Sequence, residues 1–361
     1  MKIFWFICLI FICIAAYLNL PMFGHLPDEI SMAKIKKSPN CKNGKFSNLH
    51  ATPQMTGKGG FFATMYDFYF GNHKDKIPDK ALPAVKTDLK KLNKNEDLLV
   101  WFGHSSYYIQ LHGVRYLVDP VFSNNASPIP HNVVPFEGTD IYSADDLPEI
   151  DYLIITHDHY DHLDYETVKK LRPKVKAVIT GLGTGSHLRR WGYENNIIHE
   201  MDWNETFSTN DGEIVTLPAR HFSGRSLFPN KSLWASYLIN TPNYKIYLGG
   251  DSGYDDHYKT IGNKYKDIDL ALLDAGQYDK NWRYIHAHPD EVLQAARDLG
   301  AKRIVPIHNS KFSICNHPWY EPLEKVTTRG ENENFAVLTP KIGEVVRLSD
   351  KSQKFSRWWK L

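Results

Sequence analysis

The sequence predicts a layered α/β domain in which helices cover packed β-sheets. From about residue 97 onward, short apolar runs rich in β-branched and aromatic residues alternate with turns, which is typical of strands. Two segments within the same region carry the capping signals of helices. Many strands with a few interleaved helices indicate sheets that pack together, with the helices outside. Because 42% of the 361 residues are hydrophobic, the chain can fill a large core.

The apolar runs give the expected strands in chain order. We predict strands within 98–103, 107–111, 114–120, 152–157, 176–180, 213–221, 234–240, 244–251, 270–276 and 303–309. A helix is predicted over 165–171, capped by Asp164. A second helix is predicted over 289–299, because Pro289 opens it, acidic residues fill its first turn and Gly300 follows its end.

The N-terminus is a separate apolar segment. Residues 3–18 read "IFWFICLIFICIAAYL" without a charge, and together with 19–23 they approach the ~20 residues that span a bilayer. A cleaved signal segment is the alternative, but it needs small residues before the cut, and Ala15 and Ala16 have bulky neighbours. We therefore predict that residues 1–23 anchor the protein in a membrane, specifically the bacterial inner membrane, with the main domain in the periplasm.

Residues 24–96 are predicted to form an irregular, partly extended arm that packs on the main domain, because they are rich in Gly, Pro, Asn and Lys. The aromatic stretch "GGFFATMYDFYFGN" at 59–72 either joins this packing or contacts lipid. The net charge of +2 argues against a nucleic-acid partner. Cys41 and Cys315 form a bridge in an oxidising compartment or remain free thiols.

Metal-ligating residue types gather where predicted strands end. The segment "YLIITHDHYDHLD" at 152–164 contains the pattern H-x-H-x-D-H, and imidazole and carboxylate groups both bind zinc. A chance cluster of surface histidines does not explain such a run directly after a buried strand. Three further predicted strands also end in a potential ligand. The seven donors, enough for two metal ions if one carboxylate is shared, are His157, His159, Asp161, His162, His221, Asp251 and His308.

This arrangement resembles the metallo-β-lactamase superfamily, in which H-x-H-x-D-H precedes a distant His, an Asp after Gly-Gly and a last His. The resemblance implies a four-layer αββα sandwich for residues 97–361, with a two-metal site at one edge of the sheets. Five segments further resemble the branch of N-acyl-phosphatidylethanolamine phospholipase D. They are "WFGHSSYYIQLHGVRYLVDPVFS" at 101–123, "RHFSGR" at 220–225, "GGDSGY" at 249–254, "HAHPDEVLQAA" at 286–296 and "IHNSKFSICNHPWYEP" at 307–322.

The resemblance also implies a role for each donor. One zinc would be held by His157, His159 and His221, and the other by Asp161, His162 and His308, with Asp251 as the bridge. The catalytic set is therefore expected to comprise Asp161, Asp251 and His286, a histidine that contacts the substrate phosphate.

The sequence also suggests roles for several neighbouring residues. His288 is the alternative to His286. Asp119 either orients a ligating imidazole or forms a turn with Pro120, His104 is expected to be structural, and Asp158 is not expected to be a ligand. Iron or manganese would suit the same donors.

The expected function is hydrolysis of phosphodiesters by a membrane-associated binuclear zinc enzyme, with N-acyl-phosphatidylethanolamine-like phospholipids as substrates. Two metal ions make a water molecule acidic enough to attack at neutral pH, and the predicted anchor favours a lipid. One alternative is a lactonase or other carboxylic-ester hydrolase of the same superfamily. Another is a non-catalytic metal-binding membrane protein, which the complete donor set disfavours. A homodimer is implied by resemblance alone.

Overall fold

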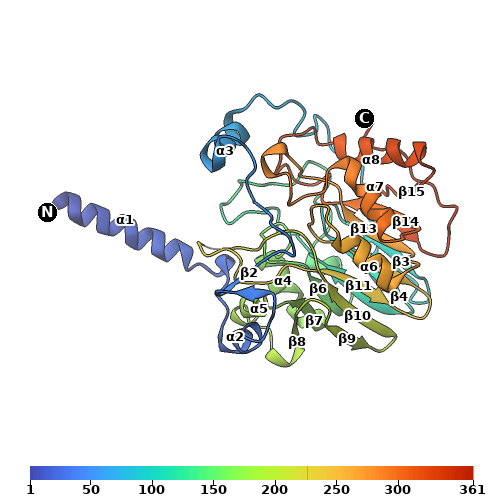
Figure 1. The fold of residues 1–361 in the computed structure, drawn as a ribbon, viewed down its shortest axis with the longest axis horizontal. Helices are drawn as coiled ribbons and strands as arrows, with labels where there is room; N and C mark the ends of the chain where they lie inside the picture. Colours follow the sequence, from blue (N-terminus) through green and yellow to red (C-terminus); the bar gives the residue numbers. More distant parts are fainter. Residues whose placement is uncertain (226, 361) are drawn as a thin grey trace.

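The computed structural model describes residues 1–225 and 227–360. In this part of the chain, two seven-stranded sheets form the body of the protein (Figure 1). The first sheet has the order β16-β3-β4-β5-β6-β7-β8, and β5 to β8 run parallel to one another. Its strands are β3 (Leu98–Trp101), β4 (Tyr107–Leu111), β5 (Val114–Val118), β6 (Ile150–Ile155), β7 (Val175–Gly181), β8 (Ile198–Met201) and β16 (Val345–Arg347).

The second sheet has the order β15-β14-β13-β12-β11-β10-β9, and β12 to β15 are parallel. Its strands are β9 (Thr206–Thr209), β10 (Gly212–Leu217), β11 (Ser236–Asn240), β12 (Lys245–Leu248), β13 (Leu270–Asp274), β14 (Arg303–Ile307) and β15 (Ala336–Val337). A small hairpin of β1 (Cys41–Lys42) and β2 (Lys45–Phe46) lies in the N-terminal arm.

The two sheets pack face to face because successive strand residues point to opposite sides. In β13, Leu270 and Leu272 enter the core between the sheets, whereas Ala271 and Leu273 pack outward against helices. Helices α4 (Tyr165–Leu171) and α5 (Gly185–Arg190) cover the outer face of the first sheet. The helices over the second sheet are α6 (His257–Tyr265), α7 (Pro289–Asp298) and α8 (Glu321–Asn332). The predicted four-layer αββα sandwich is confirmed.

Local sequence signals explain the elements that were predicted. All ten predicted strands and both predicted helices are present. Asp164 caps α4 by accepting the N–H of Glu166, and the side chain of Glu291 accepts the N–H of His288 at the start of α7. The unpredicted strands β8, β9, β15 and β16 are short, and β9 is polar and half exposed, so they lack a clear apolar pattern.

The arm over residues 24–96 contains more regular structure than predicted. Helix α2 (Glu29–Ile35) is tied to α5 because Arg189 forms an ion pair with Asp28 at 2.6 Å. The aromatic stretch forms a second helix, α3 (Gly60–Phe70). Several of its side chains are exposed, namely Phe61, Phe62, Tyr66, Tyr69 and Phe70. Cys41 and Cys315 are both free thiols.

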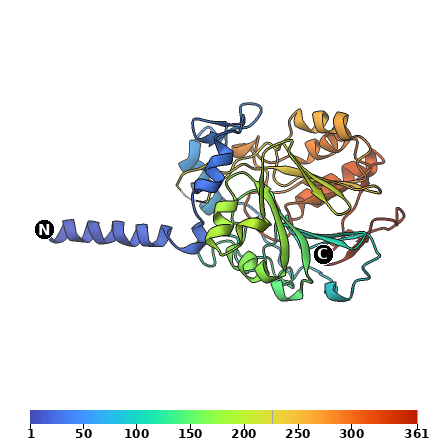
Figure 2. The ribbon, with the colours of Figure 1, turned by 90° about the horizontal axis from the view of Figure 1, so that it is seen from below.

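The N-terminal helix α1 (Lys2–Leu18) extends away from the body (Figures 1 and 2). Its 17 residues rise by about 1.5 Å each, so the helix is shorter than the ~30 Å hydrocarbon core of a bilayer. It ends at Leu18, because residues 21–23 form a 3₁₀ turn with buried Phe23. Across the described residues, no helix has the length and apolarity needed to cross a membrane. The predicted anchor and inner-membrane localisation are therefore wrong.

Candidate metal centre

Strand ends bring the predicted ligands to one edge of the two sheets. His157 follows β6 after a single residue, His308 directly follows β14, and the segments after β10 and β12 carry His221 and Asp251. The Gly-Gly turn before Asp251 allows this placement. Gly250 has a φ of +59°, and a side chain there would meet Thr156 at 2.9 Å. All seven predicted donors lie together at this edge.

The first group consists of three histidines around one position. Nε2 of His157 lies 2.9 Å from Nδ1 of His159, and Nε2 of His221 lies 3.2 Å from the same atom. His157 and His221 are buried, and their Nε2 atoms lie 3.8 and 3.5 Å from Oδ2 of Asp251. Three imidazole nitrogens and one carboxylate oxygen therefore converge, which is a donor set suited to zinc.

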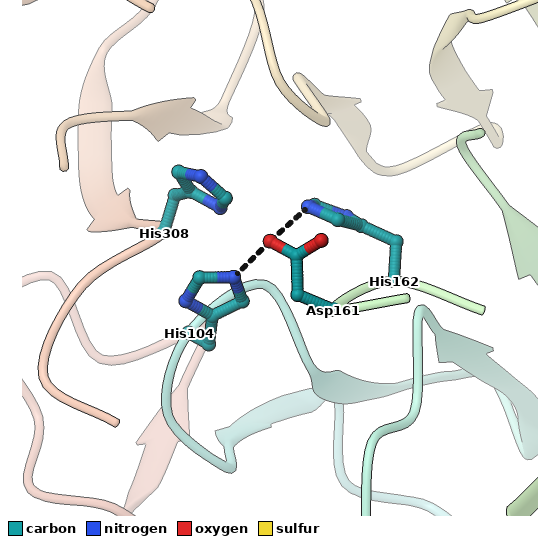
Figure 3. Close-up of side chains that lie close together, drawn as sticks. All are labelled: His104, Asp161, His162 and His308. Atoms are coloured by element: carbon teal, nitrogen blue, oxygen red, sulfur yellow. Dashed lines mark hydrogen bonds and ion pairs between the residues drawn. The ribbon is translucent and has the colours of Figure 1, made fainter. Parts of the chain in front are cut away.

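The second group faces the other oxygen of Asp251. Nε2 of His162 and Nδ1 of His308 lie 3.1 and 3.0 Å from Oδ1 of Asp251. Oδ2 of Asp161 lies 3.5 Å from Nε2 of His162. Figure 3 shows Asp161, His162 and His308 turned toward one another, with His104 beside them. His104 was expected to be structural, but its Nε2 lies 2.9 Å from Oδ2 of Asp161.

Unpaired buried atoms show that this geometry fits cations. Oδ1 of Asp251 and Nε2 of His162 are buried and make no hydrogen bond of acceptable geometry, although they are 3.1 Å apart. Buried polar atoms without partners are costly in a folded protein. A divalent cation bound by each group would give both atoms a partner, because Asp251 presents one carboxylate oxygen to each group.

The protonation states of three of the predicted histidine ligands also suit metal binding. Burial holds the pKa of His157, His221 and His308 well below the ordinary value for histidine. Neutral imidazole has the free lone pair that a metal ion requires. Burial raises the pKa of Asp161, but His162 and His104 outweigh it and hold the pKa well below the ordinary value. These three imidazoles are therefore neutral and Asp161 is ionised. For His162, burial lowers the pKa, but the carboxylates of Asp251 and Asp161 outweigh it and hold the pKa well above the ordinary value.

Hydrogen bonds fix the orientation of several donors. Nδ1 of His162 donates to Oδ2 of Asp119 at 2.8 Å, and the same carboxylate accepts the N–H and hydroxyl of Thr156. The orienting contact considered for Asp119 is therefore present. Nδ1 of His221 donates to the carbonyl of Ile285 at 2.9 Å. Such contacts select which ring nitrogen faces a metal.

A model of the beta-lactamase superfamily domain matches residues 114–309, which is more than half of the chain. The chain belongs to the metallo-β-lactamase superfamily. An uncharacterized Mycobacterium tuberculosis protein is 34% identical over 90% of this chain and 88% of its own length. N-acyl-phosphatidylethanolamine-hydrolyzing phospholipase D 1 of Caenorhabditis elegans is 29% identical over 76% of this chain and 83% of its own.

A solved structure of the superfamily fold comes from CmlA, a diiron β-hydroxylase of Streptomyces venezuelae. It superposes with a TM-score of 0.53 and 20% identity, and the match covers 70% of this chain and 54% of CmlA. The chain thus spans about half of that protein, and the likeness concerns the fold alone. Together with the relatives, the family match identifies the protein as a metal-dependent hydrolase of the superfamily.

Two further residues of this superfamily site form a buried pair. Nδ1 of His286 donates to Oδ2 of Asp274 at 2.8 Å, and Asp274 also accepts the N–H groups of Ser252 and Gly276. Sequence reasoning missed Asp274, although it is a carboxylate at the end of a predicted strand, as Asp119 is. The alternative His288 instead begins α7, and its ring packs on Tyr278.

Asp158 lies outside both groups of ligands. Its carboxylate accepts hydrogen bonds from the hydroxyl of Ser232 at 2.6 Å and from the N–H of Gly224 at 2.7 Å, and it contacts His187. These bonds secure the loop and engage both carboxylate oxygens. Asp158 therefore has a structural role in the loop and is not among the residues that converge on the centre.

A cavity of about 510 Å³ opens onto the centre. Part of its lining consists of His159, Asp161, His221, Asp251, His286 and His308. The rest of the lining is mainly apolar and includes residues of α3, a helix far from the ligands in sequence. Its lining comes from Phe61, Met65, Phe68, Tyr69, Val133, Phe222, Trp282, Ile285 and Ile314. The cavity thus combines a polar, metal-binding part, here called the floor, with an apolar part, here called the wall.

Proposed function

We propose that the protein is a binuclear zinc phosphodiesterase of the phospholipase D type, with N-acyl-phosphatidylethanolamine-like phospholipids as substrates. The observation that carries this proposal is the position of Asp251. Its Oδ2 faces His157 and His221, whereas its Oδ1 lies within 3.1 Å of the second group. A carboxylate shared in this way is suited to a pair of cations rather than to a single ion.

The chemistry follows from what the side chains hold. Bound zinc ions would supply an acidic water molecule and stabilise charge on a phosphoryl group. His157, His159, His221 and Asp251 would hold one ion, and Asp161, His162, His308 and Asp251 the other. All of these side chains except His159 and Asp161 are buried, so most of the ligand atoms have little contact with bulk water.

His286 is suited to a substrate-binding role beside these ligands. Because its Nδ1 donates to Asp274 at 2.8 Å, its Nε2 is left for an oxygen of the substrate phosphate. Its ring lies parallel to that of His308, with centroids 4.9 Å apart, and it lines the cavity. A donor at this place would offset negative charge that develops on the phosphate.

The apolar wall supports a lipid substrate. A phosphodiester that reaches the floor would place its remaining groups against Met65 and Phe68 of α3 and against Trp282. Pockets for lipids and similar molecules combine apolar lining with a few placed polar groups. The C. elegans relative is named for hydrolysis of N-acyl-phosphatidylethanolamine, and this substrate has both a phosphodiester and long acyl chains.

The direct test measures metal content and hydrolysis on the same purified sample. The substrates are bis-p-nitrophenyl phosphate and a fluorescent N-acyl-phosphatidylethanolamine in mixed micelles. We expect two zinc ions per chain and cleavage of both diesters. In His159→Ala, cleavage should fall by at least about 100-fold, since one position loses a ligand.

The matched control is His199→Ala, because His199 is half-buried in β8 and packs on Phe207, outside the centre. This variant should retain both metals and both activities. Two bound metals without cleavage of either diester would overturn the proposed reaction. Hydrolysis of lactones by the same sample would then identify a carboxylic-ester hydrolase instead.

A further inference from the structure

His104 is held against the metal centre by its backbone as well as by its side chain. It lies in the turn between β3 and β4, is fully buried and has a φ of +53°. Its N–H donates to the carbonyl of Asn309, and its carbonyl accepts the N–H of His308, both at 2.9 Å. The turn is thereby joined to the end of β14, which carries a predicted ligand.

The side chain of His104 contacts the carboxylate of Asp161. Nε2 lies 2.9 Å from Oδ2, and the ring centroid lies 4.1 Å from that of His308 (Figure 3). Asp161 is the more exposed partner, with 15% of its side chain accessible. The other close nitrogen, Nε2 of His162, is 3.5 Å from the same oxygen. His104 therefore makes the shorter contact with this carboxylate.

Two roles are compatible with this position. His104 groups with Asp161, His162 and His308, whose potential ligand atoms all lie within 4.8 Å of one another. However, the seven other donors already provide three ligands for each position and a shared carboxylate. The Nε2 of His104 is aligned as a donor to Asp161, and its Nδ1 is buried without a hydrogen-bond partner. A neutral imidazole protonated on Nε2 accounts for both observations.

We propose that His104 is a positioning residue that fixes the carboxylate of Asp161 and so determines the affinity of the second metal position. The inference rests on the two-metal centre of the proposed function. An N–H donor at Oδ2 restricts rotation of the carboxylate and so fixes its position relative to His162 and His308. Residues that orient a ligand in this way typically contribute about 10- to 100-fold to metal affinity.

The test compares His104→Gln with His104→Asn by calorimetric titration of the metal-free full-length protein with Zn²⁺. The glutamine amide can reach Asp161 and donate, whereas the asparagine amide is one methylene shorter. Asparagine tolerates a positive φ well, so this variant should fold. For Asn we expect second-site affinity to fall by about 10- to 100-fold with the first site unchanged. Gln should restore the affinity to within about threefold of wild type by the same bond.

Each other outcome overturns the inference. Unchanged second-site affinity in His104→Asn would show that the contact does not matter. Equal weakening of both sites would indicate a structural role, and a Gln variant as weak as Asn would indicate that the imidazole is itself a ligand. Circular dichroism and zinc binding at the first site show whether each variant is folded. A wild-type protein that binds only one metal would instead contradict the proposed two-metal centre.

Discussion

At the scale of single residues, the centre depends on carboxylates that do not bind metal themselves. Asp119 is fully buried and accepts three hydrogen bonds, two from Thr156 and one from Nδ1 of His162. Burial raises the pKa of Asp119, while the bond from His162 acts in the opposite direction. The contact fixes the His162 ring so that Nε2 points toward Asp251, at 3.1 Å from Oδ1.

We therefore expect Asp119→Asn to weaken the second metal position selectively. An asparagine can present an acceptor at only one of the two oxygen positions, so at least one buried donor loses its partner. Affinity for the second zinc ion should fall by about 10- to 100-fold in a calorimetric titration. The control is Asp151→Asn, near the start of the neighbouring strand β6, where the carboxylate is paired with Lys176. Equal affinities in both variants would contradict this account of Asp119.

At the scale of elements, the loop from β6 to α4 is secured by Arg225. This buried guanidinium donates to the carbonyls of Asp158 and Leu163 within the loop, at 2.9 and 2.6 Å. It also donates to the carbonyl of Met22 in the N-terminal segment and stacks on Tyr160, 4.1 Å from the ring centroid. Four of the seven predicted ligands lie in this loop, so the arginine supports the geometry of both groups.

Replacing the guanidinium group of Arg225 with the single ammonium group of lysine should destabilise the loop from β6 to α4. In Arg225→Lys we expect a loss of about 1 to 3 kcal/mol in the free energy of unfolding, because buried carbonyls lose their donors. Chemical denaturation of the metal-free protein measures this value. Arg172→Lys is the control, since Arg172 donates to one exposed carbonyl, that of Gly192. A loss no larger than that of the control would show that the loop does not depend on Arg225.

The elements also show which features a sequence can predict. Strand ends with His or Asp could be located because apolar runs mark the strands, and the structure brings His157, His221 and His308 to one edge. The end of the N-terminal helix could not be predicted, because apolar residues continue past Leu18 while the backbone turns at Pro21. The contact of His104 with Asp161 spans 57 residues and has no local signal.

At the scale of the whole molecule, the cavity is completed by a segment that lies far from the ligands in sequence. Helix α3 of the arm contributes Phe61, Met65, Phe68 and Tyr69 to the apolar wall of the cavity. Phe68 also packs with Trp282 and Ile285 of the main domain. Composition suggested an irregular arm, because the helix gains its packing partners only in the folded protein. The arm consequently forms part of the cavity in which the proposed substrate would bind.

This arrangement predicts that α3 discriminates between substrates by their apolar groups. Met65→Lys places a charge on the apolar wall. The apolar contact between this side chain and an acyl chain, which contributes roughly 1.5 kcal/mol or more to binding, is then lost. We expect KM for long-chain N-acyl-phosphatidylethanolamine to rise by at least about tenfold, while kcat/KM for bis-p-nitrophenyl phosphate changes by less than about twofold. Phe62→Lys is the matched control, because Phe62 is 86% exposed. If Met65→Lys slowed both substrates equally, α3 would act on the centre itself and not on the recognition of lipid.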